Sequence, residues 1–300
     1  MEKQDLWVLD GGMGRELARR GAPFRQPEWS ALALMEAPET VREVHLAYAT
    51  SGARVITTNS YALVPFHIGE ARFAAEGEAL AALAGQLARE VADEQGGAVK
   101  VAGSLPPLFG SYRADLFEPG RVNELATPLV RALSPHVDLW LAETMSLIAE
   151  PLALKALLPQ DGKPFWVSFT LEDEAPGSEP TLRSGERVAD AVAALASAGV
   201  DAILFNCCQP EVIEGALKVA VAALQAQGHS DVRLGAYANA FPPQPKEATA
   251  NDGLDEIRGD LGPLDYLGWA ERWRAAGANL IGGCCGIGPE HIAALASRLR

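Results

Sequence analysis

A regular alternation of two kinds of segment constrains the fold of this chain more than any other feature. Short apolar segments rich in Val, Ile and Leu are typical of strands buried on both faces of a parallel sheet. Longer Ala-rich amphipathic segments lie between them. Eight apolar segments are predicted strands: Leu6–Asp10, Arg54–Thr58, Val99–Ser104, Val137–Glu143, Pro164–Thr170, Asp201–Cys207, Val232–Asn239 and Asn279–Gly283.

The Ala-rich segments are predicted helices, and several end in a turn whose glycine supplies a left-handed helix stop. Among them are Pro38–Ser51, Glu70–Asp93, Asn123–Leu133, Glu186–Ala198 and Glu211–Gln227. Eight strand–helix repeats, without residues for a second domain, predict a closed (β/α)8 TIM barrel, an α/β fold spanning 1–300 as one domain. The alternative is an open doubly wound sheet. It is disfavoured because no GxGxxG fingerprint follows the first strand.

Two long loops interrupt the alternation. Ser104–Pro119 is rich in proline and aromatic residues and follows the third strand, and Ala240–Pro263 is polar and follows the seventh. Loops of this length are typical of functional lids or of mobile surface segments. Because both follow the carboxyl end of a strand, where barrel active sites lie, their position favours lids.

The charge and cysteine content exclude several classes of function. With 39 acidic and 25 basic residues and a net charge of −14, the chain is not expected to bind nucleic acid. No apolar run is long enough for a signal peptide or a membrane span, so we expect no membrane partner. The four cysteines form two adjacent pairs, which make a poor disulfide framework. They indicate a reducing cytoplasm and metal or redox chemistry.

Polar residues stand at the carboxyl end of every predicted strand. In a barrel these ends meet at one mouth, so their side chains are expected to converge on a site. They are Asp10, Thr58 with Asn59, Ser104, Glu143, Thr170, Asn206 with Cys207, Asn239, and Cys284 with Cys285.

The cysteines give the sharpest prediction about this site. Cys207 ends the sixth strand, and Cys284 and Cys285 follow the eighth, where flanking glycines allow both sulfurs to turn inward. Three thiolates with one open position are typical of catalytic zinc. There are two alternatives to zinc binding. The cysteines could be buried as small hydrophobic residues, or the adjacent pair could form a redox site. Cys208 is predicted to pack in the core, because neighbouring strand residues face opposite sides.

Two acidic residues are candidates for substrate contact. Asp10 precedes a glycine-rich loop and either belongs to the site or caps the helix predicted at Arg15–Arg20. Glu143 ends an apolar strand, where a buried carboxylate needs a positive partner. That partner is either a substrate ammonium, which we favour, or a lysine or arginine of the protein.

Several motifs resemble the homocysteine S-methyltransferase family, and they run from residue 9 to residue 286. They are Leu9-Asp10-Gly11-Gly12-Met13-Gly14-Arg15-Glu16-Leu17 with Arg20-Gly21, Trp29-Ser30-Ala31, Val41-Arg42-Glu43-Val44-His45, Thr57-Thr58-Asn59-Ser60-Tyr61, Ala142-Glu143-Thr144, Asn206-Cys207 and Gly282-Gly283-Cys284-Cys285-Gly286.

The resemblance implies a (β/α)8 barrel that binds Zn²⁺ and transfers a methyl group to homocysteine, forming methionine. It implies that three cysteines bind the metal and that Glu143 binds the substrate amino group. It further implies that Asp10 acts beside Glu143 as a second catalytic residue. The zinc ligands are Cys207, Cys284 and Cys285, and the substrate-binding residues are Asp10, Gly11, Thr58, Glu143 and Asn206.

The chain looks most similar to the compact members that use S-methylmethionine or S-adenosylmethionine, both sulfonium donors. It departs from them at Ser104–Gly110, where a Ser-x-Gly-Pro element is usual, and at Tyr237-Ala238-Asn239, where Tyr-Pro-Asn is usual. Both departures fall where the donor is expected. Phe109, Tyr112 and Trp140 are candidates for a cation–π contact with the donor, with simple packing as the alternative.

Other functions remain as alternatives at this point. They are methyl transfer from betaine, a selenocysteine or other thiol acceptor, a dithiol oxidoreductase using Cys284 and Cys285, and a non-catalytic barrel in which zinc only stabilises the fold. The oxidoreductase leaves Asp10 and Glu143 without a role.

Overall fold

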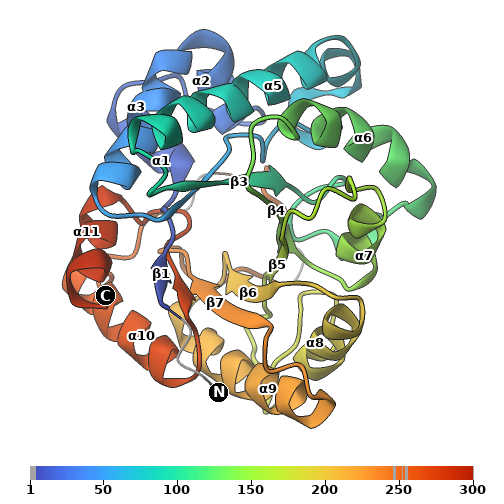
Figure 1. Ribbon diagram of the computed structural model, residues 1–300, viewed down its shortest axis with the longest axis vertical. Helices are drawn as coiled ribbons and strands as arrows, with labels where there is room; N and C mark the ends of the chain where they lie inside the picture. Colours follow the sequence, from blue (N-terminus) through green and yellow to red (C-terminus); the bar gives the residue numbers. More distant parts are fainter. Residues whose placement is uncertain (1–4, 246–247, 252, 254–255, 300) are drawn as a thin grey trace.

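The computed structural model describes residues 5–245, 248–251, 253 and 256–299, and it is a (β/α)8 barrel (Figure 1). Eight parallel strands form one sheet in the order β1-β8-β7-β6-β5-β4-β3-β2. The strands are β1 Trp7–Val8, β2 Val55–Thr57, β3 Lys100–Leu105, β4 Leu139–Met145, β5 Phe165–Phe169, β6 Ala202–Asn206, β7 Arg233–Tyr237 and β8 Leu280–Ile281. All eight predicted strands are therefore present, most of them shorter than predicted.

Pairing between the first two strands closes the sheet into a barrel. The backbone N–H of Asp10 donates to the carbonyl of Val55 at 3.0 Å, and that of Arg54 donates to Val8 at 2.7 Å. A parallel bridge between Leu9 and Val55 lies between these two bonds. An open doubly wound sheet would leave these edges apart, so that alternative is wrong.

Helices surround the strands on the outside (Figure 1). They are α1 Met13–Arg19, α2 Ser30–Glu36, α3 Pro38–Thr50, α4 Pro65–Ile68, α5 Glu70–Glu94, α6 Val122–Leu133, α7 Ala149–Lys155, α8 Val188–Ser197, α9 Pro210–Gln227, α10 Pro263–Ala275 and α11 Pro289–Arg298. Two short 3-10 helices, Ala114–Leu116 and Pro119–Arg121, lie in the loop after β3. The five helices predicted above are confirmed to within two residues at each end.

Alternation along the strands divides the buried apolar side chains into two groups. On β6, Ile203 and Phe205 join the large cluster between the sheet and the helices. Ala202 and Leu204 belong to the small cluster inside the barrel. The next residue of the inner series is Asn206, at the mouth of the barrel. The same alternation on β4 carries Glu143 to the inner side.

The loop after β7 contacts the segment between α1 and α2, which follows β1. Gln26 Nε2 donates to the carbonyl of Ala250 at 3.0 Å, and Trp29 Nε1 donates to Oδ1 of Asn251 at 2.8 Å. Residues 246–247, 252 and 254–255 of the predicted lid lie outside the described residues. The lid therefore stays a prediction.

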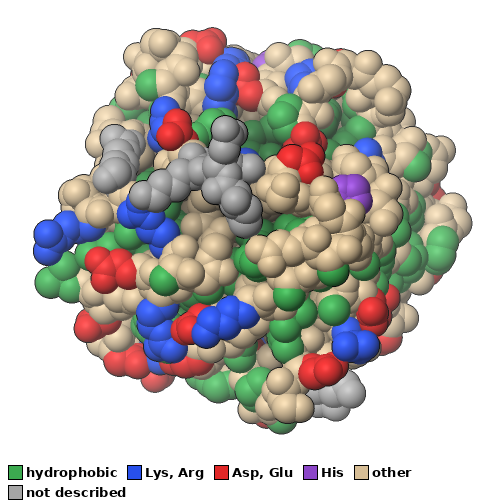
Figure 2. All heavy atoms as spheres, turned by 60° about the horizontal axis from the view of Figure 1, so that its bottom comes forward, with side chains coloured by type: hydrophobic (Ala, Val, Ile, Leu, Met, Phe, Trp, Pro, Cys, Tyr) green, Lys and Arg blue, Asp and Glu red, His purple; other side chains and the backbone are tan. Residues whose placement is uncertain are grey.

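Charged side chains of both signs are spread over the surface. On the face in Figure 2, the described Lys and Arg side chains alternate with Asp and Glu and form no continuous basic area. Within the described part of the chain, no helix combines the length and the apolar character needed to span a membrane.

A buried glutamate joins the loop after β3 to α7. Glu150 is 3% exposed, and its Oε1 accepts the backbone N–H of Leu108 at 2.8 Å. Burial raises the pKa of this carboxyl from 4.5 to about 7, against the effect of that hydrogen bond. Between these two values the folded state binds more protons than the unfolded state, so stability falls as the pH rises.

Replacing Glu150 with glutamine is therefore expected to stabilise the protein in alkaline solution. Because the amide oxygen keeps the bond to Leu108 without ionising, we expect Glu150→Gln and wild type to match below pH 4.5. Above pH 7 the variant should gain roughly 1–3 kcal/mol in free energy of unfolding, measured by urea titration. Glu78→Gln is the control, because Glu78 is exposed and Arg131 lowers its pKa. An equal gain at both pH values would contradict the prediction.

Candidate metal centre and active site

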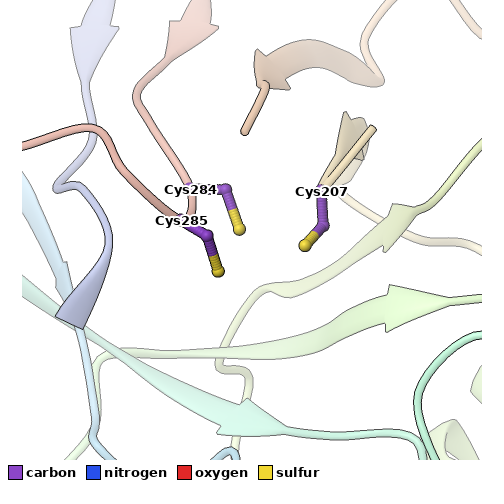
Figure 3. A group of neighbouring side chains, drawn as sticks. All are labelled: Cys207, Cys284 and Cys285. Carbon is purple, nitrogen blue, oxygen red and sulfur yellow. The ribbon is translucent and has the colours of Figure 1, made fainter. Parts of the chain in front are cut away.

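Three cysteine sulfurs converge at the carboxyl ends of β6 and β8 (Figure 3). The Sγ atoms of Cys207, Cys284 and Cys285 all lie within 4.8 Å of one another. Cys207 is 7% exposed, and the other two are half-buried. Three sulfurs at this separation match a site in which one metal ion lies between them.

Backbone conformation at the two strand ends brings the sulfurs together. Cys207 would face away from Asn206 in a regular strand, but it has φ 50°, a left-handed conformation that turns the chain. After β8 the chain makes a turn so tight that only glycine fits at position 283. A Cβ atom on Gly283 would lie 2.1 Å from Cγ2 of Ile287. Gly286 follows with φ 85°. Cys208 lies in the outer hydrophobic cluster and is fully buried, outside this group of sulfurs.

The three thiols favour a cation between them. Hydrogen bonds from the thiols of Cys284 and Cys285 hold the pKa of Cys207 well below its ordinary value. The same contact with Cys207 raises the pKa of Cys284 well above its ordinary value. One sulfur therefore ionises readily while its neighbours stay protonated, so three thiolates require a compensating positive charge. A soft or borderline divalent metal suits this donor set.

Glu143 lies on a β-bulge near the end of β4. The register with β5 shifts between Ala142 and Met145, and Thr144 has φ 60°. A bulge re-aims the side chains of a strand, and this one is found beside the sulfur cluster. Ser104 Oγ donates to Oε2 of Glu143 at 2.7 Å. Burial, together with the negative charge of Cys207, raises the pKa of Glu143 to about 7.

Asp10 contributes a second buried carboxyl group. Its Oδ2 accepts the backbone N–H of Thr57 at 2.7 Å, and its Oδ1 accepts the Thr57 hydroxyl at 3.1 Å. Burial raises its pKa to about 8, and Glu143 adds to this rise. The helix-cap alternative is wrong, because the N-cap of α1 is Gly12 and no side chain caps it. Both carboxyl groups are therefore costly to ionise without a positive charge beside them.

The other predicted substrate residues have different surroundings. Gly11 lies in a tight space, since a Cβ atom there would be 2.3 Å from the carbonyl oxygen of Ile287. The hydroxyl of Thr58 accepts the backbone N–H of Ser104 at 3.0 Å and pairs with Ser60 Oγ at 2.8 Å. The hydrogen bonds that the Thr58 hydroxyl can form are thus largely made within the protein.

Asn206 supports the bulge that carries Glu143. Its Nδ2 donates to Oγ1 of Thr144 at 2.7 Å, and the backbone N–H of Thr144 donates to Ser168 Oγ at 3.0 Å. The hydroxyl of Tyr237 also donates to Ser168 Oγ. Oδ1 of Asn206 is buried without a hydrogen-bond partner among the described residues. Asn206 therefore fixes the shape of the site and also has an oxygen to offer a ligand.

The three aromatic candidates differ in position. Trp140 belongs to the outer cluster between sheet and helices, which accounts for it as packing. Phe109 packs edge-to-face on Phe117, with ring centroids 5.8 Å apart. Tyr112 reaches the cluster of sulfurs, with its hydroxyl 3.0 Å from Sγ of Cys207. Only the last of the three contacts a predicted metal ligand.

Comparison with known proteins identifies the family. A family model described as homocysteine S-methyltransferase matches residues 7–299. The homocysteine S-methyltransferase of Escherichia coli strain K12 is 35% identical, over 99% of this chain and 96% of that protein. The chain belongs to the homocysteine S-methyltransferase family.

A solved structure and a more distant relative show how far the likeness extends. The metallated form of the E. coli homocysteine methyltransferase MmuM superposes with a TM-score of 0.77 at 34% identity, covering 99% of this chain and 97% of that one. A selenocysteine Se-methyltransferase of Brassica oleracea var. italica is 28% identical, over 97% of this chain and 88% of that protein. The dithiol oxidoreductase alternative is disfavoured by this membership and by the third converging sulfur.

Four residues in or behind the candidate site were not predicted from the sequence. They are Thr57, Ser168, Arg183 and Tyr237. Thr57 neighbours the predicted Thr58, and strand alternation could have found it, because it lies two residues after Val55 of the inner cluster. Arg183 gave no signal, because it lies in a polar segment between β5 and α8 that has no regular pattern.

Proposed function

We propose that this protein transfers a methyl group from a sulfonium donor, S-methylmethionine or S-adenosylmethionine, to the thiolate of L-homocysteine, in a reaction that depends on zinc. The observation that carries the proposal is the convergence of three cysteine sulfurs beside two buried carboxyl groups. Family membership supports the acceptor, because several relatives are named homocysteine S-methyltransferases. Free thiols also suit a reducing compartment such as the cytoplasm.

The cysteine cluster would hold the metal through Cys207, Cys284 and Cys285. Bound there, Zn²⁺ supplies an open coordination position at which the homocysteine sulfur stays ionised at neutral pH. The donor set fits this role, since soft sulfur ligands select such a metal over Mg²⁺ or Ca²⁺.

The two buried acids would bind the substrate amino group. Glu143 is oriented by the 2.7 Å hydrogen bond from Ser104, and Asp10 by its two bonds to Thr57. An ammonium ion between them would compensate the cost of their ionisation, which is the physical reason for a positive substrate group here. The backbone at Gly11 would contribute at this end of the substrate, and Ile287 and Tyr48 pack too closely against it for any side chain to fit.

The transfer itself needs no base once the acceptor sulfur is ionised. A lone pair of the homocysteine sulfur attacks the donor methyl carbon, and the bond from that carbon to the sulfonium sulfur breaks. The bonding pair remains on the departing sulfur, which leaves as a neutral thioether. What this chain's residues contribute is alignment of the two sulfur centres, worth several orders of magnitude in rate.

An assay of the purified protein tests the proposal directly. Homocysteine is supplied with S-methylmethionine, S-adenosylmethionine or betaine in parallel, methionine is measured, and bound metal is quantified in the same preparation. We expect about one zinc per chain and turnover with a sulfonium donor. Selenocysteine as acceptor distinguishes a selective from a broad thiol or selenol site. Turnover with betaine alone, or full turnover without metal, would overturn the proposal.

A further inference from the structure

A buried ion pair lies in the loops behind the proposed metal centre, and the reaction above gives it no role. Arg183 Nη2 is 2.9 Å from Oδ1 of Asp173, and their side chains are 1% and 0% exposed. Buried ion pairs are poor sources of net stability, because desolvation offsets their attraction. A gain in stability therefore does not explain this buried pair, and a functional role is the alternative.

The pair ties together three segments of the barrel mouth. Asp173, in the segment after β5, accepts the backbone N–H of Gln209 at 3.1 Å and that of Gln244 at 3.1 Å. Arg183 Nη1 donates to the carbonyls of Gln244 at 3.1 Å and Pro245 at 3.2 Å. Gln209 follows β6 two residues after Cys207, and Gln244 lies in the loop after β7. The guanidinium is thus fixed from several directions.

Arg183 also contacts an aromatic ring from a fourth segment. Its guanidinium carbon is 4.7 Å from the ring centroid of Tyr112, within the range of a cation–π contact. The Nε of Arg183 has no hydrogen-bond partner among the described residues. The guanidinium therefore leaves one hydrogen bond unmade while it stays against the ring.

Tyr112 needs support from outside its own loop. It has φ 68°, a left-handed conformation that costs a tyrosine free energy and persists only when the surroundings fix it. In this conformation its hydroxyl lies 3.0 Å from Sγ of Cys207 and 3.4 Å from the Cys207 carbonyl. A phenol donating to a thiolate draws charge from that sulfur.

We propose that Arg183 is a positioning residue that holds the Tyr112 hydroxyl against the sulfur of Cys207 and so tunes the metal-binding thiolate. It acts through the ring of Tyr112 and touches neither substrate nor metal. The inference rests on the proposed metal centre. It adds to that centre a buried network that joins the loops after β3, β5, β6 and β7 to one metal-binding residue, Cys207.

Cobalt substitution tests the inference through a signal that does not depend on turnover. The thiolate-to-cobalt charge-transfer band reports the electron density on the sulfurs, and chelator competition reports metal affinity. In Tyr112→Phe the ring remains but the hydrogen bond is lost, so we expect the band to move to longer wavelength. Metal affinity should change about ten- to hundredfold, as is typical when a partner of a metal ligand is removed.

Arg183→Lys keeps the charge beside Asp173 but loses the flat contact with Tyr112. We expect the same direction of band shift as in Tyr112→Phe, and no further shift when the two substitutions are combined. Arg187→Lys is the matched control, because Arg187 forms an exposed pair with Glu179. If Arg183→Lys does not fold, the same comparison is made with Arg183→Gln.

The outcomes separate the inference from the function on which it rests. An unshifted band in Tyr112→Phe, or in a folded Arg183 variant, overturns the inference while the metal centre stands. Additive shifts in the double variant also overturn it, because Arg183 would then act independently of Tyr112. If the wild-type protein binds neither cobalt nor zinc, it is the proposed function that fails.

Discussion

Cys207→Ala is expected to abolish both metal binding and methyl transfer. The side chain supplies one of three sulfurs that lie within 4.8 Å of one another, and no other described cysteine lies in that group to replace it. Removing this ligand leaves only two thiols at the site to bind the ion. We expect less than about a tenth of the wild-type zinc content and a loss in kcat/KM of at least about 1,000-fold. Elemental analysis and a methionine assay measure the two effects.

The neighbouring cysteine provides a matched control for this substitution. Cys208 has the same chemistry one residue later, but its side chain is fully buried in the outer hydrophobic cluster. Cys208→Ala should cost about 1 kcal/mol of stability from lost packing and should keep both zinc and activity. Equal loss of zinc in the two variants would show that disturbance of the strand end, rather than ligation, removed the metal. Full zinc content with normal turnover in Cys207→Ala would refute the proposed ligand set.

The framework of the barrel was predictable because it depends on local patterns. Each buried parallel strand reads as an apolar run, and each carboxyl end faces the same mouth, so strand ends that carry Cys207, Cys284 and Cys285 had to lie near one another. Convergence of the sulfurs needed one further property, the freedom of a glycine-flanked turn after β8. That property is also visible in the sequence as Gly282–Gly286.

Features that depend on irregular backbone were not predictable in the same way. The bulge in β4 is accompanied by contacts that Thr144 makes with Ser168 on β5 and Asn206 on β6. The substrate contact predicted at Thr58 stays a prediction, and the structure adds that its neighbour Thr57, the last residue of β2, is the threonine that bonds Asp10. A shift of one residue reverses the direction of a strand side chain.

The network behind Cys207 lies furthest from what a sequence pattern can show. Asp173, Arg183 and Tyr112 come from two irregular segments, and their contacts depend on how loops from different strands pack. The raised pKa values of Glu143 and Asp10 were also not predictable, because they result from burial, which only the folded chain defines. The substrate roles of both acids were predicted from their place at strand ends, and the burial that raises their pKa values supports that prediction.

Glu143→Gln is expected to weaken homocysteine binding while leaving the metal in place. A buried carboxylate that pairs with an ammonium contributes about 1.5–3 kcal/mol, so KM for homocysteine should rise roughly 10- to 150-fold. The amide can still accept the hydrogen bond from Ser104, which preserves the local geometry. Zinc content should be unchanged, because the side chain is a hydrogen-bonding group beside the cluster and not a member of it.

The pH dependence of KM gives this prediction its sharpest form. In the free protein the Glu143 carboxyl has a pKa of about 7, raised first by burial, so below that pH it is mostly neutral and attracts an ammonium weakly. Wild-type KM should therefore fall as the pH rises through 7, and Glu143→Gln should lose this step and keep only the step near pH 8 that Asp10 contributes. Glu150→Gln is the control, because Glu150 is also buried with a pKa of about 7 but bonds to Leu108 in a loop. If both variants lose the change in KM near pH 7, that change reflects overall stability. If Glu143→Gln loses zinc while KM is unchanged, Glu143 supports the metal centre instead of the substrate.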